Sequence, residues 1–94
     1  MNPITVVPTT QSCPFGRSYS GANLFKVKPG IPISDALEQI AMNLTQAAML
    51  CGESEDADLR ISRAMNQVIA QLIDSSSALA SAALGGLRNS GLEA

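Results

Sequence analysis

The chain has 94 residues, of which 46% are hydrophobic and 3% aromatic, and its formal net charge is −2. Two cysteines and no histidine exclude a scaffold of several disulfides and leave no ordinary set of zinc ligands, so we expect no metal and no cofactor. The six basic side chains are scattered, which argues against nucleic acid as a partner.

Residues 1–22 are rich in Pro, Gly, Ser and Thr and carry few large apolar side chains. So little apolar surface cannot offset the entropy of ordering the backbone. We therefore expect residues 1–22 to form a flexible N-terminal tail, followed by a folded part over residues 23–86 and a second tail over residues 87–94.

The sequence shows no sign of export or of a membrane span. The start, Met1 to Pro8, lacks the basic region and the apolar run of a secretory signal. Further along, Ser75-Ser76-Ser77 interrupts the longest apolar stretch, so we expect no contact with a membrane. These features predict a cytoplasmic protein with reduced thiols.

The folded part begins with a short extended arm. Over residues 23–28 the apolar Phe25 and Val27 alternate with Lys26 and Lys28, and a Pro-Gly pair follows. Alternation with a period of two is typical of a strand with one apolar face. A single strand is not stable, so we expect it to pair with a second copy of itself or to lie along a helix.

A first helix is predicted over about residues 34–51, with Ser34 as its N-terminal cap and Gly52 at its end. Its apolar residues recur at the spacing of a coiled-coil-like helix pair. They are Leu37, Ile40, Leu44, Ala47 and Cys51.

A second helix is predicted over about residues 58–84, with the acidic connector 53–58 as its cap and Gly85-Gly86 at its end. Its apolar residues form two adjoining stripes, one of Ile61, Met65, Val68, Leu72 and Leu79, the other of Ile69, Ile73, Ala80 and Leu84. They cover an arc of roughly 160°, whereas docking on one partner helix needs about 100°.

The surplus apolar stripe predicts an all-α protein in which an antiparallel two-helix hairpin with a short N-terminal extended arm dimerises into a four-helix bundle. The predicted dimer interface is Ile40, Leu44, Ile69, Leu72 and Ile73. No catalytic motif is present, so we expect a non-enzymatic interaction module, a small adaptor or regulator that binds itself, a protein partner or both.

Two further features have alternative interpretations. Met42 and Met49 lie on the side of the first helix away from its apolar seam, where flexible thioethers suit a partner surface, although isolated exposed methionines are also common. The order of basic strand, helix, turn and helix is also that of ribbon–helix–helix repressors, in which Lys26 and Lys28 would contact DNA. The long first helix and the acidic balance argue against that alternative.

The segment Leu24-Phe25-Lys26-Val27-Lys28-Pro29-Gly30-Ile31-Pro32, followed by Asp35-Ala36-Leu37-Glu38-Gln39, resembles the opening signature of a pseudomonad family of short proteins classed as a domain of unknown function. The second helix resembles that family only in pattern. The resemblance implies a small bacterial cytoplasmic helical-hairpin protein, and it brings no activity or ligand.

Overall fold

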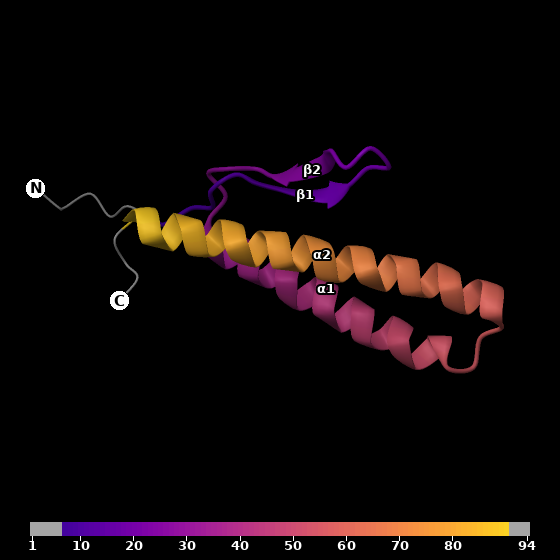
Figure 1. Cartoon of the computed structure of the whole chain (residues 1–94). Helices are drawn as coiled ribbons and strands as arrows, with labels where there is room; N and C mark the ends of the chain where they lie inside the picture. Colours follow the sequence, from indigo (N-terminus) through magenta and orange to yellow (C-terminus); the bar gives the residue numbers. More distant parts are fainter. Residues whose placement is uncertain (1–6, 91–94) are drawn as a thin grey trace, which may run out of the picture.

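Two long helices and a two-stranded hairpin make up the part of the chain that the structure, a computed structural model, describes, residues 7–90 (Figure 1). The elements are β1 (Cys13–Arg17), β2 (Asn23–Val27), α1 (Ile33–Ser54) and α2 (Leu59–Ser90). The helices pack against each other as an antiparallel pair, and the hairpin lies along α2. The predicted helical hairpin is confirmed, and the predicted extended arm is β2. The all-α prediction is corrected, because β2 pairs with β1 in a two-stranded antiparallel sheet.

The seam between the helices is formed by residues that recur every three or four positions on both helices. The buried and half-buried positions are Ala36, Ile40, Asn43, Ala47 and Leu50 on α1 and Met65, Ile69, Leu72, Ser76, Leu79 and Ala83 on α2. The predicted seam on α1 was right for Ile40 and Ala47 and wrong for Leu37, Leu44 and Cys51, which are exposed. The smaller Ala36 and Asn43 occupy the seam instead, and this leaves the larger leucines outside.

A strand lies within the segment that was predicted to be a flexible tail. Strand β1 pairs antiparallel with β2, with Cys13 opposite Val27 and Phe15 opposite Phe25. Val27 packs with Ala78 and Ala82 of α2, and Cys13 and Phe15 lie against this cluster. The prediction was wrong for residues 13–17 because their apolar side chains gain a partner strand and a helix surface. Residues 1–6 of the predicted tail lie outside the described residues.

The segment before β1 is also held in place, by Thr10. This side chain is only 4% exposed, and its Oγ1 donates a hydrogen bond to the carbonyl oxygen of Lys28, 2.7 Å away. The same Oγ1 accepts a hydrogen bond from the backbone N–H of Ile31 at 3.1 Å. Thr10 therefore fixes the joint between β2 and α1, where Gly30 takes a φ of +85°.

Helix α2 does not end at Gly85-Gly86 but continues to Ser90, so residues 87–90 of the predicted C-terminal tail are helical. Residues 91–94 lie outside the described residues. The two glycines serve close packing instead of termination, because a Cβ on Gly86 would overlap the carbonyl oxygen of Thr9. Gly86 therefore allows the segment before β1 to cross α2 at backbone distance.

The starts of the two helices differ from each other. The acidic cap predicted for α2 is confirmed, since Asp58 Oδ1 accepts a hydrogen bond from the backbone N–H of Ile61 at 3.0 Å. Helix α1 begins one residue before Ser34 and has no side-chain cap. In its first turn the backbone N–H groups of Asp35 and Ala36 donate hydrogen bonds to the carbonyl oxygen of Pro32.

Candidate functional site

The interior of the molecule contains little apolar bulk. In residues 7–90 the buried apolar side chains are Val27, Ala36, Ala47, Ile69, Ala78, Ala82 and Ala83, of which five are alanines. The large apolar side chains that are exposed are Val7, Tyr19, Leu24, Phe25, Leu37, Met42, Leu44, Met49, Leu59, Ile61, Val68, Ile73 and Leu84. Because burial of such a side chain contributes about 1.5 to 3 kcal/mol, most of the chain's apolar stabilisation is unused in one copy.

Four of these side chains lie together on one side of the helix pair, and we call them the outer face. They are Leu37 and Leu44 of α1 and Ile73 and Leu84 of α2. The outer face lies opposite the base of the hairpin, because Ile73 is nine residues from Ala82, which puts the two on opposite sides of α2. Towards the tip of the hairpin, Ile73 also lines a groove together with Phe15 and Phe25.

The same relationship holds on α1. Gln39 and Asn43 line a hollow beneath the hairpin. Leu44 is five residues beyond Gln39, a rotation of about 140°, and therefore lies on the far side of the seam. The hairpin thus leaves Leu37, Leu44 and Leu84 of the outer face open.

The structure separates the five residues of the predicted dimer interface into two groups. Ile69 is buried, and Ile40 and Leu72 are half-buried, so these three pack in the seam within one chain. Leu44 and Ile73 are 51% and 53% exposed and lie on the outer face. Only these two are available to a second copy.

The residues of the other two predicted surfaces are exposed. Met42 and Met49 lie seven residues apart on α1, and Met42 is about 160° around the helix from Leu44, so they form a stripe separate from the outer face.

Lys26 and Lys28 are also exposed, and Lys26 lies opposite Pro14 of β1. Strand β2 is thus paired within its own chain, so a ribbon–helix–helix dimer would have to use the other edge of β2.

A second apolar surface lies between the hairpin and α2. A groove of about 970 Å³ separates the far end of the hairpin from the middle of α2, and it is open to solvent rather than enclosed. Its large apolar walls are Phe15, Leu24 and Phe25 of the hairpin and Val68, Leu72 and Ile73 of α2, so Ile73 belongs both to the outer face and to the edge of this groove. The sequence did not single out this groove, because its hairpin wall depends on β1, which was predicted to be flexible.

The described residues bring no cluster of metal-ligating side chains together. Over residues 7–90 no group of three Cys, Asp or Glu side chains is placed to hold a metal ion. Cys13 and Cys51 are free thiols, Cys13 beside the hairpin core and Cys51 exposed on α1.

Helix α2 is long and apolar enough to cross a membrane by length and composition, which differs from what the serine run predicted. That observation is weak evidence, because core helices of soluble proteins meet the same criterion. Arg60 and Arg63 near its start and Asp74 in its middle make one side of this helix polar.

Comparison with known proteins places the chain in a family. The sequence matches the family described as "Protein of unknown function (DUF3077)" over residues 9–66, more than half of the chain, and the chain belongs to that family. The match covers both strands, α1 and the start of α2. No curated protein and no solved structure matches the chain significantly.

Proposed function

We propose that this member of the DUF3077 family is a non-enzymatic protein-interaction module that acts as a homodimer, with two outer faces closing a four-helix bundle. One contrast supports the proposal most directly. The buried core is made largely of alanine, whereas the outer face exposes three leucines and an isoleucine to water. A second copy would bury that surface on both chains at once.

The geometry of the outer face suits a second helix pair. Its large side chains, Leu37, Leu44, Ile73 and Leu84, come from both helices, and the exposed Ala41 and Ala80 lie between them. Small residues beside large ones allow the ridges of one helix to enter the grooves of another. The base of the hairpin packs on the opposite side of α2, at Ala82, so a two-fold axis near Leu37, Leu44 and Leu84 keeps the base of the hairpin away from the second copy.

The test is the double variant Leu44→Asp with Ile73→Asp, with Met42→Asp and Met49→Asp together as the control. Both double variants place two carboxylates on half-exposed helix positions, so they match in charge and in helix propensity. We expect the first to sediment as a monomer and the control to sediment as a dimer. A dimer of the Leu44 and Ile73 variant with an unchanged circular dichroism spectrum would contradict the proposed interface.

We also propose that the protein works in the bacterial cytoplasm as an adaptor or regulator. Two free thiols, Cys13 and Cys51, are consistent with a reducing compartment. The dimer would still expose apolar surface to which a partner protein could bind. Native mass spectrometry of the protein purified gently from its own host would test this. A foreign subunit bound to the dimer is the expected result, and the dimer alone under all growth conditions would contradict an adaptor role.

A further inference from the structure

The groove between the hairpin and α2 has the form of a binding site for part of another protein. The base of the hairpin is held to α2 by Val27, which packs on Ala78 and Ala82. Towards its tip the hairpin leaves α2 (Figure 1). A groove of about 970 Å³ lies between the two, lined on α2 by residues that include Val68 and Leu72. Because the groove is open along the surface, it suits a few side chains of an extended peptide laid across it.

The wall on the hairpin side is preorganised. The rings of Phe15 and Phe25 lie opposite each other on the two strands, with centroids 5.5 Å apart and planes inclined at 32°. Phe25 also lies across Gly16, where an added Cβ would be 2.8 Å from the ring. Gly16 has a φ of +70°, so glycine suits both its backbone and the approach of the ring. An apolar ligand would therefore meet a surface that is already formed.

The charged side chains of the hairpin itself are all basic. Over residues 7–34 the charged side chains are Arg17, Lys26 and Lys28, with no acidic residue among them. Arg17 lines the groove itself, and across it Asp74 is the one acidic side chain among the residues that line it. A ligand with acidic groups on the hairpin side would find complementary charge there.

We propose that this groove binds a segment of a foreign protein that presents apolar side chains flanked by acidic residues. The proposal rests on the interaction function proposed above, and it adds a second surface and the chemistry of its partner. In the proposed dimer the outer face takes up Ile73 at one edge of each groove, whereas the hairpin wall and Val68 lie outside the outer face, so this part of each groove remains open.

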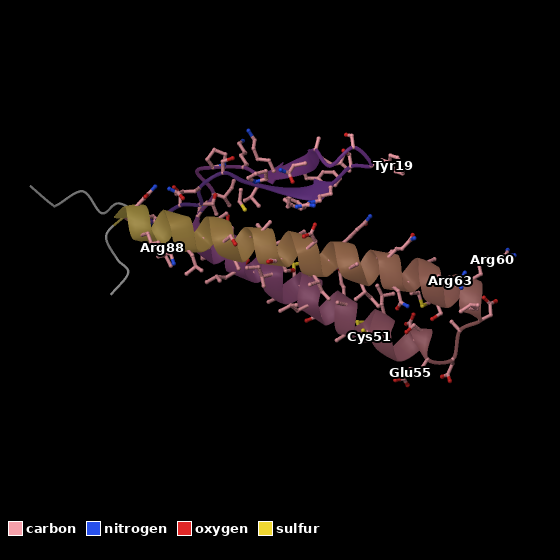
Figure 2. The ribbon with its side chains drawn as sticks, viewed as in Figure 1. Tyr19, Cys51, Glu55, Arg60, Arg63 and Arg88 are labelled. Atoms are coloured by element: carbon pink, nitrogen blue, oxygen red, sulfur yellow. The ribbon has the colours of Figure 1, made fainter. Side chains whose placement is uncertain are left out.

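The chain's own acidic segment is a poorer occupant. The acids of the connector between α1 and α2 lie at the end of the helix pair, where Figure 2 shows Glu55 below α2 and away from the hairpin tip that carries Tyr19. The apolar side chains nearest to those acids, Leu59 and Ile61, alternate with Arg60 and precede Arg63. If this segment of a second copy entered the groove, Arg60 and Arg63 would be repelled by Arg17. A free acidic segment does not carry that penalty.

The proposal is tested by selecting a displayed library of random twelve-residue peptides on the full-length protein. The Val68→Asp variant serves for counter-selection, because it places a carboxylate in the groove at a half-exposed position. The selected peptides are then titrated by fluorescence polarisation against the wild type, Arg17→Glu and Arg63→Glu. Arg63 provides the matched control, since it allows the same charge reversal on α2 outside the groove.

We expect the selected peptides to combine acidic and large apolar residues and to bind at least tenfold more weakly to Arg17→Glu, with unchanged binding to Arg63→Glu. Sedimentation of Arg17→Glu should still show the dimer, which separates this test from that of the outer face. Basic peptides, or no peptide that distinguishes the wild type from Val68→Asp, would overturn the proposal. Peptides that reproduce residues 53–61 would overturn it in favour of a second copy.

Discussion

Asn43 of α1 donates a hydrogen bond from its Nδ2 to Oγ of Ser75 on α2 across the helix seam, at 3.2 Å. Asn43 is only 5% exposed, and its Oδ1 accepts a second hydrogen bond from Nε2 of Gln39 at 2.8 Å. A buried amide at a seam position fixes the register of two helices, because any slip leaves its polar atoms without partners.

Asn43→Ala should therefore destabilise the protein. The variant loses both hydrogen bonds and leaves a small void in the seam, which together cost about 1 to 3 kcal/mol. Urea denaturation followed by circular dichroism measures the change. Asn66→Ala, at an exposed position of α2, is the control and should leave the midpoint nearly unchanged. Equal effects of the two substitutions would show that the seam position of Asn43 is not important.

Gly86→Ala and Gly52→Ala should have opposite effects. Both glycines lie inside helices, where alanine normally adds about 0.8 to 1 kcal/mol of stability. No atom lies within 4 Å of a Cβ added at Gly52, so that variant should gain stability. At Gly86 the new methyl group would overlap the carbonyl oxygen of Thr9, so the Gly86→Ala variant should lose stability. Thermal midpoints of the pair, measured at one protein concentration, check the prediction. A more stable Gly86→Ala protein would show that residue 9 does not cross α2 there.

Thr10→Val should loosen the joint between β2 and α1. Valine keeps the shape of threonine but removes the hydroxyl group, so the carbonyl of Lys28 and the N–H of Ile31 each lose a partner. We expect a loss of about 1 to 3 kcal/mol in the free energy of unfolding. Thr45→Val, which removes a hydroxyl bonded only to the preceding turn of α1, should change it by less than about 0.5 kcal/mol. Amide hydrogen exchange should also become faster over residues 28–31 in Thr10→Val alone.

The stability of the wild type should depend on its concentration. If the outer faces of two copies bury each other, dissociation accompanies unfolding and mass action raises the midpoint as the protein becomes more concentrated. Thermal unfolding over a hundredfold range of concentration measures this. The Leu44→Asp and Ile73→Asp double variant should unfold at a lower temperature that no longer varies. A constant midpoint for the wild type would contradict an obligate dimer.

The sequence predicted the two helices, the turn between them and the strand at residues 23–27, because each has a strong local signal. The acidic cap at Asp58 was predictable for the same reason. Strand β1 was missed because a proline, a glycine and a cysteine in five residues give no clear alternation, and its stability comes from β2 and α2.

The seam on α1 was misplaced because periodicity alone cannot distinguish two neighbouring stripes when both contain apolar residues. Hydrophobicity favoured Leu37 and Leu44, whereas the structure uses Ala36 and Asn43. The polar Asn43 could have indicated the true seam, since its partner on the other helix, Ser75, lies in the serine run of α2. Gly85-Gly86 was misinterpreted because a glycine that ends a helix and a glycine that admits a crossing segment look alike in sequence.

The hairpin packs on Ala78 and Ala82, which lie near the end of the described chain and beyond the part that the family match covers. A ribosome makes the strands before it makes this surface. An isolated two-stranded hairpin is only marginally stable in water. Until Ala78 and Ala82 have been synthesised, the strands lack the helix surface that stabilises them. We expect a nascent chain that stops before residue 78 to contain helix but no protected strand amides. The hairpin, its groove and the Thr10 contacts would then form together after translation of the last turns of α2.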